Sequence, residues 1–163
     1  MYWFKRKIWQ IRNLFRWIPI IWNQYDFDYR YSIEVFKFQL QKTADLLGSD
    51  KACTLSSKDN SRRLQIIIDL MDKVYEEYYA LEYQDKLKKL YGEEKFEHKF
   101  IPCVDKEGYS QLKYSYELTE TPEMIKEISE KQHKLLKESH KKQERAHKLL
   151  WDLIDHNIRR MWD

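Results

Sequence analysis

The chain has 163 residues, of which 42% are hydrophobic and 35% charged, a size and composition typical of one folded domain. It contains only three Gly and three Pro, which argues against sandwiches, barrels and Rossmann folds, because these need many tight turns or glycine-rich phosphate loops. We therefore expect an all-α protein, a single domain over residues 1–163 built as an elongated three- to four-helix bundle. The net charge of +3 conceals a basic start: residues 1–25 hold five cations and no acid, and the remainder holds 25 basic against 27 acidic residues. This balance does not favour a nucleic-acid binder.

Residues 1–25 form an aromatic, basic head that contains four of the six Trp. Phe4, Ile8, Ile11, Phe15 and Ile18 recur at helical spacing and predict a helix over residues 2–18, which Pro19 should end or kink. We expect the head to pack its Trp side chains into the bundle or against another subunit. Docking on a protein partner and lying on a membrane surface are the alternatives, the latter because Lys and Arg opposite Trp and Phe are typical of interfacial helices. The longest apolar run, residues 17–22, is too short to span a bilayer, so we expect a cytosolic protein.

Residues 26–92 are expected to form two helices. The first runs from about Phe27 to Leu47, begins at Asp26 or Asp28 and is closed by Gly48. A polar loop over residues 49–60 follows, and the second helix runs from about residue 60 to residue 91, closed by Gly92. Its predicted buried stripe consists of Leu64, Ile67, Ile68, Met71, Val74, Tyr75, Tyr78 and Leu81.

Residues 93–120 lose the helical period, and we expect an irregular insert or a small hairpin near residues 93–118. A long C-terminal helix is predicted over residues 121–163, because Thr121, Pro122 and Glu123 are a typical helix start and nothing interrupts the chain before about Trp162. Such a helix is about 60 Å long. The helix carries a predicted heptad seam of apolar residues: Ile125, Ile128, Leu135, Leu149 and Leu153. This long helix would leave part of its seam exposed, so we expect a homo-oligomer.

Two patterns in the sequence contain residue types that bind metal ions. His133, His140 and His147 are seven residues apart, which separates neighbours by about 10 Å along one helix, so they cannot share one metal ion. The run from Glu93 to Glu97 resembles half of the metal motif of all-helical nucleotide pyrophosphohydrolases, but residues 98–125 lack the second acidic pair. We therefore expect no catalytic residue, no metal and no cofactor, and we rank a metal-dependent enzyme third among the function classes.

Tyrosine and arginine suggest a binding site. The chain has twelve Tyr, several of them crowded on one side of the predicted second helix, whose start carries two Arg. A Tyr ring can stack on a base, and Arg, Lys and His can hold phosphates. The alternative is that these Tyr are half-buried where helices meet. The candidate ligand-binding residues are Arg62, Arg63, Tyr75, Tyr79, His140 and Lys142.

Both ends of the chain carry a resemblance. Residues 17–41 (WIPIIWNQYDFDYRYSIEVFKFQLQ) and 156–163 (HNIRRMWD, with Met161 where the class usually has Trp) are similar to a class of small, uncharacterised helical proteins of tailed bacteriophages. The resemblance implies a phage origin and the host cytoplasm, and it supplies no chemistry. We therefore expect a non-enzymatic phage protein that counters host defence, by sequestering a nucleotide-type signal or by occluding a host defence protein. The alternative is a protein-interaction or virion-structural protein.

Overall fold

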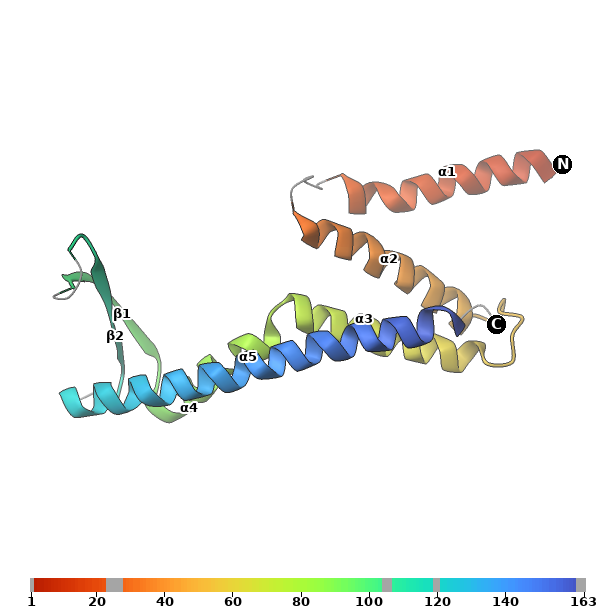
Figure 1. Cartoon of the computed structure of the whole chain (residues 1–163). Coiled ribbons are helices and arrows are strands. Elements are labelled where there is room, and N and C mark those ends of the chain that lie inside the picture. Colours follow the sequence, from red (N-terminus) through yellow and green to blue (C-terminus); the bar gives the residue numbers. More distant parts are fainter. Residues whose placement is uncertain (1, 23–27, 104–106, 119–120, 161–163) are drawn as a thin grey trace. The chain divides into compact units, whose positions relative to one another are not determined.

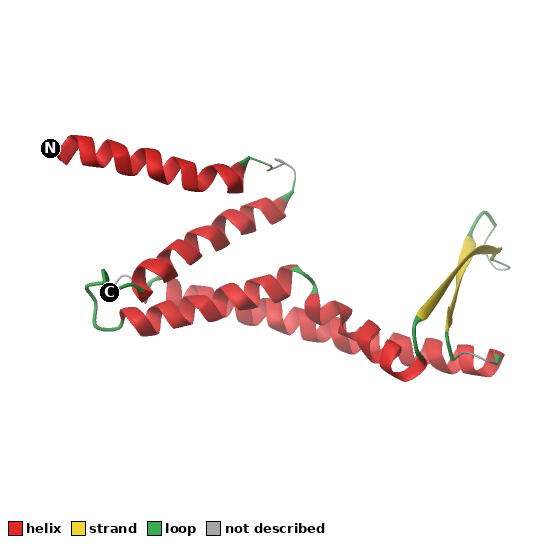
Figure 2. Cartoon of the chain, turned by 180° about the vertical axis from the view of Figure 1, so that it is seen from behind, coloured by secondary structure: helices red, strands yellow, loops and turns green. Residues whose placement is uncertain are grey.

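The computed structural model describes residues 2–22, 28–103, 107–118 and 121–160, and these residues are mainly helical (Figure 1). The prediction of a helical protein with a long C-terminal helix is confirmed. The helices are α1 (Tyr2–Ile21), α2 (Tyr29–Gly48), α3 (Ser57–Tyr75), α4 (Tyr78–Tyr91) and α5 (Pro122–Ile158), and two antiparallel strands, β1 (Glu94–Pro102) and β2 (Ser110–Tyr116), lie between α4 and α5 in the sequence (Figure 2).

The chain divides into two compact units. The first unit comprises residues 1–75 and 149–163, and the second comprises residues 76–148. Helix α5 therefore contributes about its last quarter, from Leu149, to the first unit and the rest to the second.

In the first unit, α2 packs against α3. Asp28 is the N-cap of α2 and accepts a hydrogen bond from the Arg30 backbone N–H, as the sequence predicts. The predicted stripe of α3 is buried as far as Val74, with Leu64 fully buried. Other buried apolar residues of this unit are Leu40, Ala44, Leu47, Ile67, Ile68, Met71, Leu150 and Ile154.

Gly48 ends α2 for a reason other than the one predicted. It does not adopt a positive φ, and Ser49 is the C-cap. A Cβ atom on Gly48 would lie 2.9 Å from Ser61 Oγ, and that hydroxyl donates to the Ala44 carbonyl at 2.7 Å. A Cβ atom at position 48 would therefore displace this hydroxyl, so the close approach of α2 and α3 favours glycine here.

The single helix expected over residues 60–91 is wrong, because α3 and α4 are separate helices. The chain breaks at Glu76 and Glu77, and Glu77 adopts the left-handed conformation with φ 57°. The Arg30 guanidinium donates to the Tyr75 carbonyl at 3.1 Å, which satisfies an acceptor that α3 leaves open at its C-terminus. Beyond the break the predicted stripe fails, since Tyr78 and Leu81 are exposed. Residues 26–92 thus contain three helices and not two.

The core of the second unit is formed by Leu87 of α4, Tyr116 of β2 and Ile128 of α5. The strands pair from Glu94 opposite Tyr116 to Pro102 opposite Ser110, with an irregularity between residues 97 and 100. Partly buried side chains surround this core: Tyr83, Tyr91 and Leu135.

The buried side of α5 follows a different repeat from the predicted heptad. Ile128, Ser139 and Leu150 are buried and spaced by eleven residues, whereas Leu149, a predicted seam residue, is exposed. An eleven-residue repeat corresponds to about 3.67 residues per turn, close to a straight α-helix, whereas a heptad needs supercoiling. Thr121 caps the helix as predicted, through a hydrogen bond from the Met124 N–H at 3.3 Å. The helix ends at Ile158, and residues 161–163, part of the C-terminal resemblance, lie outside the described residues.

Candidate binding sites

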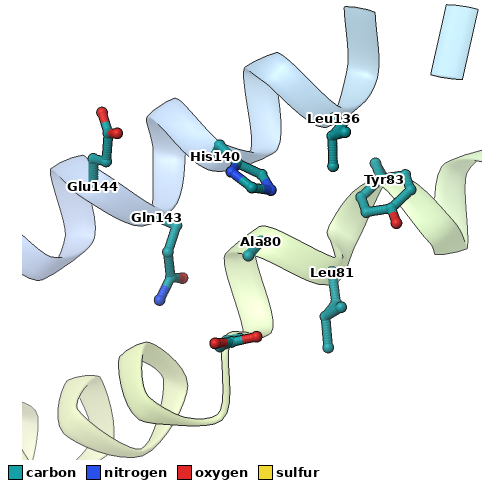
Figure 3. A pocket seen from close by; sticks show the side chains of 8 residues that line it. Ala80, Leu81, Tyr83, Leu136, His140, Gln143 and Glu144 are labelled. Atoms are coloured by element: carbon teal, nitrogen blue, oxygen red, sulfur yellow. The ribbon is translucent and has the colours of Figure 1, made fainter. Parts of the chain in front are cut away.

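A pocket of about 320 Å³ lies between α4 and α5 in the second unit. Figure 3 shows Leu136, His140 and Gln143 pointing from α5 towards α4, whereas Glu144 points away from α4. Besides the Tyr83 phenol, the ionisable lining residues are two carboxylates and one imidazole, without Lys or Arg, so the pocket suits a phosphate poorly. The lining residues are Glu77, Ala80, Leu81, Tyr83, Leu136, His140, Gln143 and Glu144.

Lys142 is held by a carboxylate of its own unit. Its Nζ donates to Glu82 Oε2 at 2.7 Å and lies 5.3 Å from the centroid of the Tyr79 ring. The hydrogen bond to Glu82 raises the pKa of Lys142, and the same bond lowers the pKa of the Glu82 carboxyl. Because its charge already has a partner, Lys142 is less available to a phosphate.

The six predicted ligand-binding residues are divided equally between the two units. Arg62, Arg63 and Tyr75 belong to the first unit, and Tyr79, His140 and Lys142 to the second. Arg62 and Arg63 are exposed on α3. The structure brings Lys142 next to Tyr79 and places His140 in the pocket.

Tyr75, the last residue of α3, is partly buried in the first unit. Burial raises the pKa of its phenol, and the nearby Tyr29 raises it further, while a side-chain hydrogen bond with Trp151 acts in the opposite direction. Its carbonyl accepts from Arg30. The phenol and the backbone carbonyl of Tyr75 thus both form hydrogen bonds within the first unit. This agrees with the alternative interpretation, in which the tyrosines are half-buried where helices meet.

Within the described residues, no group of three or more His, Cys, Asp and Glu side chains could hold a metal ion. Glu93, from the motif that resembles the pyrophosphohydrolases, forms an ion pair with Lys88. That pair raises the pKa of Lys88.

Among the described residues, exposed large apolar side chains are most numerous on α1. The side chains of Trp3, Phe4 and Phe15 are each about two thirds exposed, with values of 70%, 64% and 66%. Packing of the head into the bundle of its own chain, the expectation from the sequence, is therefore wrong for most of α1. The other exposed large apolar residues of this helix and its end are Ile8, Trp9, Ile11, Leu14, Ile21 and Trp22.

Helix α1 touches α2 through two side chains near its C-terminal half. Trp17 packs edge-on against Phe38 with the ring centroids 4.8 Å apart, and Asn13 Oδ1 accepts from Lys42 Nζ at 2.8 Å. Lys42 Nζ also lies 4.9 Å from the Trp17 ring centroid. Of the two effects expected of Pro19, the ending of the helix does not occur: α1 continues to Ile21, and the Trp22 N–H bonds to the Ile18 carbonyl at 2.9 Å.

The contact with α2 and the apolar stripe lie on opposite sides of α1. At about 100° per residue, Phe4, Ile8, Ile11 and Phe15 fall within an arc of about 60°. On the same scale Asn13 and Trp17 are centred roughly 170° away from the middle of that arc. The stripe from Phe4 to Phe15 therefore faces solvent, and the opposite side of the helix, which carries Asn13 and Trp17, makes the intramolecular contact.

No helix in the described part of the chain is both long enough and apolar enough to cross a membrane.

No protein-family description matches this chain, and comparison with curated proteins and with solved structures also gives no match.

Proposed function

We propose that this chain is a non-enzymatic binding protein that attaches to a membrane surface through α1. One observation carries the proposal: α1 presents Phe4, Ile8, Ile11 and Phe15 to solvent, on the side opposite to its contact with α2. Exposed apolar surface of this extent on a folded chain marks an interaction site.

A bilayer interface fits the composition of α1 better than a small-molecule site does. The helix combines an apolar stripe of Phe and Ile with exposed Lys and Arg elsewhere, and it has no acidic residue. Helices of this kind lie in the plane of the membrane with the apolar stripe among the upper acyl chains. Because α2 contacts the other side, α1 can bury its stripe without leaving the first unit.

The phage origin and the role against host defence belong to the same proposal and rest on the resemblance alone. In that setting the chain would occupy the inner face of the host membrane and occlude a defence protein there with its remaining helical surface. Homo-oligomerisation and the three- to four-helix bundle are likewise proposals. Sequestration of a nucleotide-type signal receives no support from the α4–α5 pocket, whose ionisable side chains are mainly acidic.

Vesicle flotation of the full-length protein tests membrane attachment. Replacing Phe4 and Phe15 together with Gln removes two exposed rings from the stripe. A fully buried Phe contributes about 1.5–3 kcal/mol, so two rings that are two thirds exposed contribute about 2–4 kcal/mol, and the double variant should bind about 100-fold more weakly.

The matched control replaces Leu46 and Ile66 with Gln, since these residues are 53% and 54% exposed on α2 and α3. The control should bind vesicles as the unmodified protein does. Circular dichroism should be unchanged in both variants, because all four side chains are exposed. Equal loss of binding in the two variants, or no loss in either, would rule out the stripe of α1 as the membrane contact.

A further inference from the structure

The cations of α1 have no carboxylate partner. Lys5, Arg6, Lys7, Arg12 and Arg16 are exposed, and none forms an ion pair among the residues that the structure describes. Elsewhere in the chain, lysines such as Lys37 and Lys142 do pair, with Asp72 and Glu82 respectively. The first helix therefore presents an uncompensated positive charge of five.

Four of these cations flank the apolar stripe, whereas Arg6 lies on the opposite side of the helix, the side of Asn13 and Trp17. At about 100° per residue, Lys5, Arg12 and Arg16 share an arc of about 40° that adjoins the stripe on the side of Ile8 and Phe15. Lys7 lies on the other flank, with its Nζ 5.9 Å from the centroid of the Trp3 ring. When the stripe is buried in a membrane, long side chains at these flanks reach the level of the phosphate groups.

We infer that α1 selects membranes with anionic headgroups, its flanking cations contacting lipid phosphates while its apolar stripe enters the acyl region. This inference rests on the proposed membrane attachment and adds the class of lipid. The supporting argument is charge complementarity, since residues 1–25 contain no acid that would repel or neutralise an anionic surface. A juxtamembrane Lys or Arg strengthens binding to an anionic leaflet by roughly fivefold, so two of them account for about 30-fold.

The experiment measures partitioning of the full-length protein into vesicles of phosphatidylcholine alone and into vesicles that also contain phosphatidylglycerol. Replacing Arg12 and Arg16 with Gln should weaken binding to the anionic vesicles about 30-fold and leave binding to the neutral vesicles unchanged. Replacing the same two residues with Lys should preserve binding to the anionic vesicles, because the charge is kept. Raising the salt concentration should weaken the binding of the unmodified protein to anionic vesicles only.

The charge-matched control is Lys58→Gln with Lys73→Gln, two exposed positions on α3 that take part in no ion pair within the described residues. It should bind anionic vesicles as the unmodified protein does. An equal loss in this control would assign the selectivity to the total charge of the chain and overturn the role of α1. Full binding by the Arg12 and Arg16 Gln variant would overturn it as well.

The two proposals fail in different ways. If the unmodified protein binds neutral and anionic vesicles equally well, anionic selection is wrong while membrane attachment stands. If it binds neither, membrane attachment itself is wrong, and the stripe of α1 must be assigned to a protein partner.

Discussion

Replacement of Gly92 with Ala should destabilise the second unit substantially. Gly92 follows α4 directly, with φ 79° and ψ −167°, and its N–H bonds to the Lys88 carbonyl at 2.9 Å. This region of backbone conformation is essentially restricted to glycine. A Cβ atom at this position would also lie 3.0 Å from both Cβ and Oε2 of Glu117.

Two effects set the magnitude. The backbone strain of an L-residue in this conformation costs about 1–3 kcal/mol. The Cβ contact adds to it, because Glu117 Oε2 accepts a hydrogen bond from the Glu93 N–H at 3.3 Å and must shift to make room. We therefore expect Gly92→Ala to lower the free energy of unfolding by about 2–3 kcal/mol.

Substitution of the other two glycines tests backbone strain and the crowding of an added Cβ atom separately. Gly108 has φ 81° but no atom within 4 Å of an added Cβ, so Gly108→Ala should show the strain alone, about 1 kcal/mol. Gly48 has no positive φ, and the atom nearest to an added Cβ is the Ser61 hydroxyl. In Gly48→Ala this hydroxyl can turn away and lose its hydrogen bond to the Ala44 carbonyl. The expected loss of stability is again about 1 kcal/mol.

Urea unfolding followed by far-ultraviolet circular dichroism measures all three variants against the unmodified protein. Gly92→Ala should be the least stable of the set. A Gly92→Ala protein within about 0.5 kcal/mol of the unmodified chain, or more stable than Gly108→Ala, would refute the combination of strain and crowding at this position.

Three further predictions concern the cores and the charges. Leu64→Ala should destabilise the first unit by about 2–5 kcal/mol, since Leu64 is fully buried. In the same urea experiment, Ile66→Ala at an exposed neighbouring position should change the free energy of unfolding by less than about 0.5 kcal/mol. Burial raises the pKa of Tyr116 to about 12, so its stabilising effect is complete below the ordinary value of 10.0 and disappears as the pH rises through about 12. An alkaline absorbance titration should show a phenol that ionises near pH 12 and that Tyr116→Phe removes. Lys142→Ala should return the lowered pKa of Glu82 towards its ordinary value, as measured by NMR titration, while costing less than about 1 kcal/mol because the pair is exposed. A Glu82 titration unchanged by that substitution would contradict the ion pair.

Local sequence determines the helix ends that could be predicted. Asp28, Thr121 and Gly92 act at the ends of α2, α5 and α4 through bonds to backbone atoms a few residues away. Such bonds depend on residue type and spacing, and both are visible in the sequence. The apolar period of residues 64–74 is equally local, and it predicts the buried stripe of α3.

The break between α3 and α4 could not be predicted in this way, because neither Gly nor Pro marks it. The Tyr75 carbonyl finds its donor in Arg30, which is 45 residues away in the sequence, and Glu77 accepts a left-handed conformation that an L-residue adopts at a cost. A contact between distant parts of the chain thus decides where α3 ends.

The first helix shows the limit of periodicity most clearly. The spacing of Phe4, Ile8, Ile11 and Phe15 identifies an apolar stripe correctly, but spacing carries no information about what covers that stripe. In this structure the polar pair Asn13 and Lys42, together with the Trp17 ring, holds α1 on α2, and the stripe is left outside. In such a helix one side contacts the same chain and the apolar side faces solvent. The helix is stabilised fully only when something else covers the apolar side. Membrane attachment is proposed because a lipid surface would cover the stripe and match the unpaired cations beside it in a single contact.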